Sequence, residues 1–170
     1  MEERREVICR TQTDSGELQL QRRGKHFELI SNGTFLMATH NGESERRLVQ
    51  STLDAAGNSR QVLIDGLGVG FSLGAALAST ELEKVTVVEI SPQIIAWNRT
   101  YLAEFSSNGI TDDRTRIVNA DLIQWLIKTD DCFDAICIDI DNGPTWTVRP
   151  ENSWLYSPEG LCAVREHLHD

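Results

Sequence analysis

Long apolar segments are missing from this chain of 170 residues. No apolar run approaches the ~20 residues that span a bilayer, so we expect no membrane partner. The N-terminal segment MEERRE is charged, and no apolar core follows it, so it does not resemble a signal peptide. We therefore expect a cytoplasmic protein.

Cysteine and histidine are few and scattered, with four residues of each kind. The cysteines show no CxxC spacing, which argues against a zinc site or a disulfide framework. We expect free, mostly buried thiols and no metal ion. The four cysteines are Cys9, Cys132, Cys137 and Cys162.

Basic residues are also scarce, with 16 Lys and Arg against 26 Asp and Glu, a net charge of -10 and a pI of about 4.8. An acidic surface repels phosphate backbones, so we do not expect nucleic acid as a partner. The same charge attracts a cationic small molecule such as a polyamine, or it serves solubility alone. Charge by itself does not decide between these two interpretations.

Internal repeats and low-complexity segments are absent, and the length suits one compact unit. Within it, residues 1–42 are expected to form a small antiparallel β unit, because apolar and polar residues alternate over 17–21 and further strands fit 27–30 and 34–37. Asn32-Gly33 is a strong hairpin signal between the last two strands. Residues 43–170 are expected to form the second, larger part.

Strands and helices alternate regularly in that larger part. This alternation predicts an α/β fold with a parallel sheet covered on both faces. A loop of about twenty residues, rich in Trp, Pro and Asn, follows the last strand, and such loops are usually functional or disordered. The expected strands are 62–64, 84–90, 115–118 and 133–138, and the expected helices are 43–56, 71–79, 92–105, 122–128 and 158–169.

A glycine-rich loop follows the first strand of that sheet. Glycines allow a tight turn and close approach of a ligand, and the helix behind the loop offers free N–H groups. The spacing is GxGxG, and the third glycine of a dinucleotide fingerprint is replaced by Phe71. The loop therefore fits an adenosylmethionine-type nucleoside better than a dinucleotide, although a purely structural turn is the alternative. Its candidate binding residues are Asp65, Gly66, Gly68 and Gly70.

Acidic residues follow the next two strands. Glu89, which precedes Ile90, is placed to accept hydrogen bonds from both ribose hydroxyls. Asp121, which precedes Leu122, can accept a hydrogen bond from the adenine amino group, or it can serve as a helix N-cap. Both roles are compatible, and we treat all four residues as candidates for nucleoside binding.

Asp139, Asp141 and Asn142 follow the fourth strand, next to Gly143-Pro144. A carboxylate at this edge can orient an amine, accept its proton or stabilise a sulfonium. The alternative is a turn capped by Asx side chains. We take Asp139 as the candidate catalytic residue and the other two as candidate substrate contacts.

In this order, the motifs resemble the class I adenosylmethionine-dependent methyltransferase fold, and especially its spermidine synthase (polyamine aminopropyltransferase) branch. The segment 83–92, EKVTVVEISP, is similar to that branch's second-strand motif, and the N-terminal β unit resembles its small N-terminal domain. The resemblance implies that the glycines wrap adenosylmethionine or its decarboxylated form, that Glu89 holds the ribose and that Asp121 contacts the adenine. It also implies that Asp139 accepts the proton of the substrate amine.

Departures from that family fall in the half of the site that would bind the amine. Val69 stands where the family's loop carries an acid, and Asn142 stands where a second acid follows the catalytic one. The family's Tyr-His pair is absent, with Arg47 and Leu48 in that region. The aromatic residues Trp146, Trp154 and Tyr156 could line a different acceptor pocket, or they could serve only to pack the loop.

The last two strands of the class I fold have no counterpart after Pro158, so the sheet is expected to stop at about five strands. Such a sheet has an exposed edge, which means that either the chain is truncated or a partner covers the edge. We expect a homodimer. Three functions stay open: aminopropyl transfer to an amine, methyl transfer to a small acceptor, and a non-catalytic nucleoside-binding protein.

Overall fold

The computed structural model describes residues 4–139 and 149–169. By their contacts, the residues fall into two compact units, 1–44 and 45–170. No helix in the part of the chain that is described is long and apolar enough to cross a membrane.

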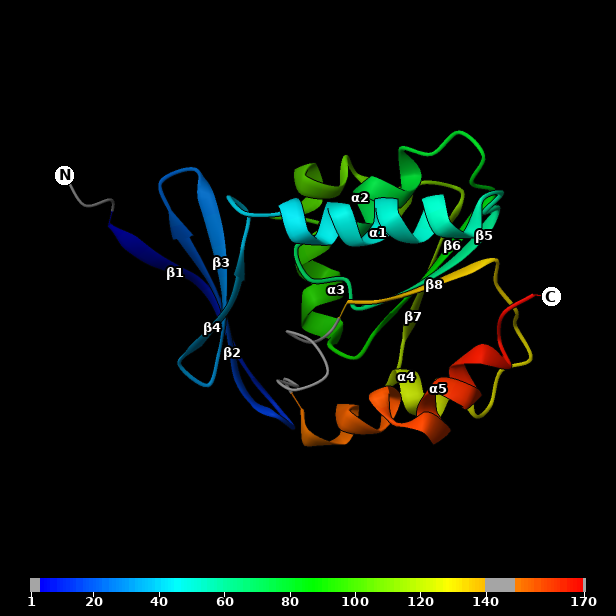
Figure 1. The fold of residues 1–170 in the computed structure, drawn as a ribbon. Coiled ribbons are helices and arrows are strands. Elements are labelled where there is room, and N and C mark those ends of the chain that lie inside the picture. Colours follow the sequence, from blue (N-terminus) through cyan, green and yellow to red (C-terminus); the bar gives the residue numbers. More distant parts are fainter. Residues whose placement is uncertain (1–3, 140–148, 170) are drawn as a thin grey trace. The chain divides into compact units, whose positions relative to one another are not determined.

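The first unit is an antiparallel sheet whose strands pair in chain order (Figure 1, blue). The chain reverses between the last two strands at Asn32 and Gly33, which have positive φ angles of 49° and 76°. A type I′ turn requires this left-handed backbone at both positions, so the Asn-Gly pair located the hairpin correctly. The strands are β1 (Arg5–Thr13), β2 (Gly16–Arg23), β3 (His26–Ser31) and β4 (Thr34–Ala38).

The second unit contains a parallel sheet with the strand order β7-β6-β5-β8. The order changes direction between β5 and β8, and ligands of such sheets bind at this switch point, beyond the carboxyl ends of the strands. The strands are β5 (Gln61–Asp65), β6 (Lys84–Glu89), β7 (Thr115–Asn119) and β8 (Ala135–Ile138).

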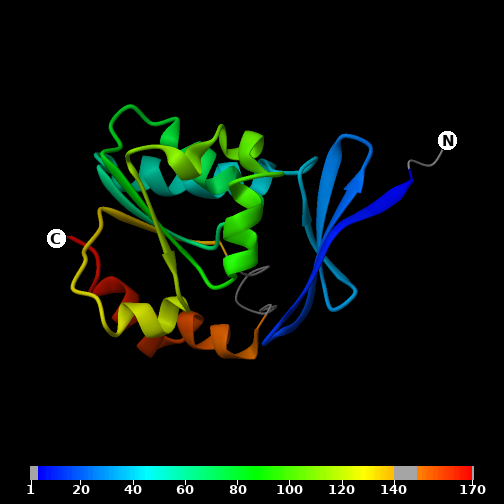
Figure 2. The same ribbon diagram turned by 180° about the vertical axis from the view of Figure 1, so that it is seen from behind.

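Helices cover both faces of this sheet. The two opposite views show α1 (Glu43–Ala56) and α2 (Phe71–Leu77) on one face and α4 (Leu122–Leu126) and α5 (Pro158–Arg165) on the other (Figures 1 and 2). This arrangement confirms the predicted Rossmann-like fold. The remaining elements are α3 (Pro92–Asn98) and the 3₁₀ segments η1 (Ala103–Ser106), η2 (Gly109–Thr111) and η3 (Pro150–Tyr156).

On the face of the sheet covered by α4 and α5, a hydrophobic core joins η3 and α5 to earlier elements of the chain. Leu155 of η3, which is fully buried, shares a hydrophobic cluster with Leu122 and Leu126 of α4. Burying a leucine side chain contributes about 1.5–3 kcal/mol, so this cluster fixes η3 against α4. The other buried members are Leu63, Val88, Phe133 and Val164.

The helix predicted over 92–105 is shorter than expected, because α3 ends at Asn98. The hydroxyl of Thr100 donates to the carbonyls of Ala96 and Trp97, at 3.1 and 3.3 Å. Such a side-chain bond competes with the helical ladder, and the chain continues as η1 instead.

Several other predictions about the second unit were wrong. The parallel sheet has four strands among the described residues, not about five. The predicted last helix ends at Arg165, after which Leu168 forms a parallel bridge with Phe133. Part of the predicted loop is η3. Across both units, the four cysteines are free as predicted, but only Cys137 is buried, whereas mostly buried thiols were expected. The homodimer stays a prediction.

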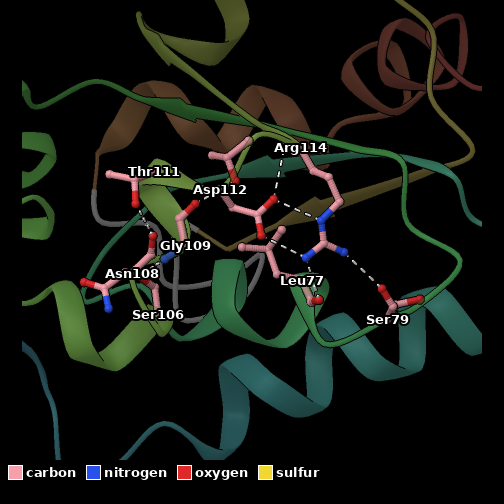
Figure 3. A network of polar contacts seen from close by, with 9 residues as sticks. Leu77, Ser79, Ser106, Asn108, Gly109, Thr111, Asp112 and Arg114 are labelled. Atoms are coloured by element: carbon pink, nitrogen blue, oxygen red, sulfur yellow. Dashed lines mark hydrogen bonds and ion pairs between the residues drawn. The ribbon is translucent and has the colours of Figure 1, made fainter.

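Arg114 closes the C-terminal end of α2 (Figure 3). Its guanidinium donates to the carbonyls of Leu77 and Ser79, at 3.1 and 3.3 Å, and is held by Asp112 at 2.9 Å. A cation at this position satisfies free carbonyls and opposes the partial negative charge of the helix end. The contact therefore anchors α2, whose other end carries the glycine loop.

We predict that Gly70→Ala destabilises the fold more than Gly57→Ala. Both glycines have positive φ, 95° and 76°, where a Cβ atom costs roughly 1–2 kcal/mol. At Gly70 the new Cβ would also lie 2.8 Å from Asn98 Oδ1 and 2.9 Å from Ser106 Cβ, whereas nothing lies within 4 Å at Gly57. Overpacking adds ~1–3 kcal/mol. Urea denaturation measures both; equal losses would contradict the packing argument.

Candidate functional site

The glycine loop connects β5 to α2 at the carboxyl edge of the parallel sheet. Gly66, Gly68 and Gly70 all have positive φ angles, of 92°, 51° and 95°. The loop is tied down at both ends, because the N–H of Gly66 donates to Val88 O at 2.9 Å and that of Gly70 to Leu67 O at 2.8 Å. The three predicted glycines thus form one tight main-chain turn over the end of β6.

Glu89 at the end of β6 fixes this loop through its carboxylate. The backbone N–H of Leu67 donates to Glu89 Oε2 at 2.9 Å, and that of Ser91 donates to Glu89 Oε1 at 2.7 Å. Burial raises the pKa of Glu89, and these N–H donors oppose the rise. Each carboxylate oxygen has two lone pairs, so the carboxylate can still accept from ligand hydroxyls.

The end of β7 is joined to the end of β6 by Asn119, which the sequence analysis did not select. Its amide donates to the carbonyls of Glu89 and Ile90, at 2.8 and 3.0 Å. The side chain of Ile90, directly after Glu89, is 46% exposed. This side chain gives the edge an apolar surface next to Glu89.

Asp121 begins α4 and acts as its N-cap, since the N–H of Gln124 donates to Asp121 Oδ1 at 3.1 Å. The other carboxylate oxygen accepts a hydrogen bond from Arg149 Nη1 at 2.9 Å. The capping role is therefore realised in the structure, while the expected contact with adenine stays a proposal. The side chain of the neighbouring Leu122 is buried in the core, so only its backbone can face a ligand.

Asp139 follows β8 on the other side of the switch point. Its N–H donates to Asp65 O at 3.0 Å, and its carboxylate accepts a short hydrogen bond from the hydroxyl of Ser72, in the first turn of α2. Burial raises the pKa of Asp139 to about 6, the Ser72 bond opposes this rise, and the charge of Glu45 adds to it. Asp139 is thus mainly ionised at neutral pH and becomes protonated as the pH falls through a pKa of about 6.

Glu45, in the first turn of α1, was missed by sequence reasoning. It is half-buried and lies two helical turns before Thr52, so the two side chains share a face of α1. Thr52 hydrogen-bonds Cys137 of β8, and burial together with the charge of Asp139 raises the pKa of that thiol to about 11. This face of α1 therefore follows β8 toward Asp139.

Arg46 secures the same turn of α1, because its guanidinium lies 4.1 Å from the ring centroid of Phe71 at the start of α2. A cavity of about 370 Å³ lies beside this pair and is lined by α1, α2 and η1 residues, among them Glu104 and Phe105. None of the predicted site residues that the structure describes lines this cavity.

Comparisons with known proteins identify the family. A model of the spermine/spermidine synthase domain matches residues 43–161. The chain belongs to the spermine/spermidine synthase family. The match includes the glycine loop and every acid at the carboxyl edge of the sheet.

Curated members of this family share about three tenths of their residues with the chain. A polyamine aminopropyltransferase of Thermococcus onnurineus is 31% identical over 137 residues, which is 79% of this chain and 48% of the relative. That of Saccharolobus solfataricus is 30% identical over 65% of this chain and 36% of the relative. Polyamine aminopropyltransferase 2 of Ralstonia nicotianae is 29% identical over 72% of this chain and 24% of the relative. The chain thus spans less than half the length of these relatives.

Solved spermidine synthases have the same fold. A spermidine synthase in complex with the transition-state analogue AdoDATO matches with a TM-score of 0.81 and 25% identity, over 95% of this chain and 54% of its own. Spermidine synthase from Thermotoga maritima gives a TM-score of 0.79 at 24% identity, over 95% of this chain and 53% of its own.

Asp141, Asn142 and Trp146 lie outside the described residues. Trp154 and Tyr156 of η3 pack against the hydrophobic cluster that contains Leu155. Loop packing is therefore the role that the structure gives to these two aromatic side chains, and an acceptor contact by Tyr156 stays a prediction.

Signals for the missed residues were weak in the sequence. Ser72 is an ordinary residue of a helix start, and only its hydrogen bond to Asp139 distinguishes it. Glu45 and Arg149 come from segments far from Asp139 and Asp121 in the chain. No group of three or more His, Cys, Asp or Glu side chains placed to hold a metal occurs within residues 4–139 and 149–169.

We predict opposite pKa shifts of Asp139 in two variants. Ser72→Ala removes a hydrogen bond to the carboxylate and raises the pKa, whereas Glu45→Gln removes a neighbouring negative charge and lowers it. A carbon-13 NMR titration of the carboxyl signal, assigned with Asp139→Asn, measures both. Shifts in the same direction would contradict the assigned causes.

Proposed function

We propose that this chain carries the nucleoside site and the reacting carboxylate of an aminopropyltransferase, which transfers an aminopropyl group from decarboxylated adenosylmethionine to an amine. Its curated relatives are polyamine aminopropyltransferases, and its structural neighbour was solved with AdoDATO. Both observations support a nucleoside co-substrate and an amine acceptor.

The nucleoside would lie across the ends of β5, β6 and β7. The glycine loop lets the ligand approach the backbone, and Asp65 lies at its start. Glu89 is buried and fixed by two N–H donors, so it is preorganised to accept from the ribose hydroxyls. Ile90 offers an apolar surface for the base, and Asp121 a carboxylate for its amino group.

The observation that carries the proposal is the carboxyl of Asp139, held by Ser72 at the switch point with a pKa of about 6. An amine attacks only when unprotonated, and an ionised Asp139 can accept its proton. In the step, the amine nitrogen forms a bond to the carbon next to the sulfonium while the carbon–sulfur bond breaks. The bonding electrons stay on sulfur, which leaves as methylthioadenosine, and the proton lost by nitrogen goes to Asp139.

The charges near Asp139 favour a cationic acceptor. Glu45 supplies a second carboxylate to this part of the site, and the whole chain has a net charge of -10. This negative charge attracts a protonated amine. The amine becomes the unprotonated nucleophile when its proton passes to Asp139. Glu45 would compensate in part for the family's missing Tyr-His pair.

Methyl transfer from adenosylmethionine is the second candidate, and Val69 favours it. At this position the family's loop carries an acid, whereas the Val69 side chain is fully buried in the apolar core. The chain therefore lacks a carboxylate that would attract the aminopropyl ammonium of the decarboxylated nucleoside at this point.

Calorimetric titration with adenosylmethionine, decarboxylated adenosylmethionine and methylthioadenosine distinguishes these candidates. Aminopropyl transfer predicts that the decarboxylated form binds more tightly than adenosylmethionine, and methyl transfer predicts the reverse. Binding of none of the three would contradict the nucleoside site itself.

Asp139→Asn is expected to lower turnover by at least about a hundredfold, in the range of a lost general base, while methylthioadenosine binding changes little. In the wild type, turnover should fall as the pH drops through about 6, because the protonated carboxyl cannot accept a proton. Glu159→Gln, at an exposed position of α5, is the control. Full activity of Asp139→Asn would exclude this carboxylate as the base.

A further inference from the structure

Arg149 holds the carboxylate that the proposed function assigns to the base of the nucleoside. Its Nη1 donates to Asp121 Oδ2 at 2.9 Å, and the two side chains are 34% and 26% exposed. The other oxygen of Asp121 is used by the N-cap hydrogen bond from Gln124. A ligand that reaches Asp121 therefore meets a carboxylate and a guanidinium together.

The position of Arg149 is built into the fold. The N–H of Asn152 donates to Arg149 O at 3.0 Å, and Pro150 follows at the start of η3. Leu155 of η3 packs into the same hydrophobic cluster as Leu122 and Leu126 of α4, the helix that Asp121 begins. Shared packing thus brings the two charged residues together, unlike most ion pairs between mobile surface side chains.

This charged pair lies next to the place proposed for the ribose and base. The N–H of Ala120 donates to Glu89 O at 3.2 Å, so the residue before Asp121 is bonded to the end of β6. The exposed side chain of Ile90 lies at the same strand end. A nucleoside whose ribose is held by Glu89 would therefore extend its base toward Asp121 and Arg149.

The hydrogen-bonding capacity of the pair is directional. An ionised carboxylate only accepts, and a guanidinium only donates, with five N–H groups in a planar fork. Adenine presents a donor, its amino group, beside an acceptor, the adjacent ring nitrogen. Hypoxanthine presents the reverse order, with a carbonyl oxygen beside a ring N–H. With Asp121 opposite the substituent at the 6-position and Arg149 opposite the neighbouring ring nitrogen, the pair is complementary to adenine and not to hypoxanthine.

We propose that Arg149 and Asp121 together read the base of the nucleoside, Asp121 accepting from the adenine amino group and Arg149 donating to the neighbouring ring nitrogen. Arg149 is then a specificity-determining residue for the co-substrate. This inference rests on the nucleoside site of the proposed function, but it does not depend on which group is transferred.

The test compares methylthioadenosine with methylthioinosine, its hypoxanthine counterpart, by calorimetric titration of the whole chain. The wild type should prefer methylthioadenosine. Arg149→Ala should weaken methylthioadenosine binding by about tenfold or more, which is the loss expected for one hydrogen bond to a charged group. It should also reduce the ratio between the affinities for methylthioadenosine and methylthioinosine. Arg149→Lys keeps the charge but loses the planar fork, so it should restore only part of the preference.

Arg116→Ala is the matched control, because Arg116 also forms an ion pair with an aspartate, Asp131, at 2.7 Å on an exposed surface. It should leave both affinities unchanged, and thermal unfolding of each variant shows whether the fold is kept. If Arg149→Ala does not fold, the inference is judged from Arg149→Lys, whose preference for methylthioadenosine over methylthioinosine should be smaller than that of the wild type.

Three outcomes overturn the inference. If Arg149→Ala binds methylthioadenosine as tightly as the wild type, or more tightly, Arg149 is only an ion-pair partner or a competitor of the base, and the nucleoside site stands. If the wild type binds both nucleosides equally, the pair does not read the base. If the folded wild type binds neither, the nucleoside site fails and the inference fails with it.

Discussion

The buried carboxylate of Glu89 and the backbone of the glycine loop stabilise one another, and the carboxyl edge of the sheet depends on this contact. A charged group that is only 6% exposed is costly unless N–H donors surround it. The loop supplies such a donor from Leu67, and the turn after β6 supplies another from Ser91. In return, the loop is held in a left-handed course that only its glycines adopt without strain. The edge is thus formed before any ligand arrives, which lowers the entropic cost of binding.

Burial raises the pKa of both Asp139 and Glu89, but several backbone N–H donors oppose the rise at Glu89, whereas only one side-chain donor does so at Asp139. Burial and the charge of Glu45 both disfavour ionisation of this carboxyl, and the Ser72 hydroxyl offsets only part of that effect. A fold selected only for stability would replace such a group by an apolar one. Ionisable groups whose charged form is disfavoured by their surroundings are frequently found at functional sites. A cation bound between Glu45 and Asp139 would relieve the repulsion.

Much of the carboxyl edge could be predicted from the sequence, because the apolar runs show where each strand ends and therefore which residues follow it. Glu89 and Asp139 were located in this way, since the ends of parallel strands meet at one edge. Ser72 could not be located, because its importance comes from a bond to a residue 67 positions away. Arg149 was hidden in a segment without periodicity, and its place depends on the packing of η3. The early end of α3 followed from the hydroxyl of Thr100, a local competition that helical periodicity does not report.

Main-chain and side-chain contacts are unevenly divided between the two parts of this edge. The glycine loop is joined to β6 by a backbone bond, from Gly66 N–H to Val88 O, as well as by the carboxylate of Glu89. Among the described residues, the two that act on the carboxyl of Asp139 are Ser72 and Glu45, and both act through side chains that a single substitution can remove. If the proposed function holds, substitutions at these two side chains would alter the acceptor side of the site while the backbone bond of the glycine loop stays in place. The first turns of α1 and α2 would then be suitable places for redesigning the choice of acceptor while the remaining architecture is kept.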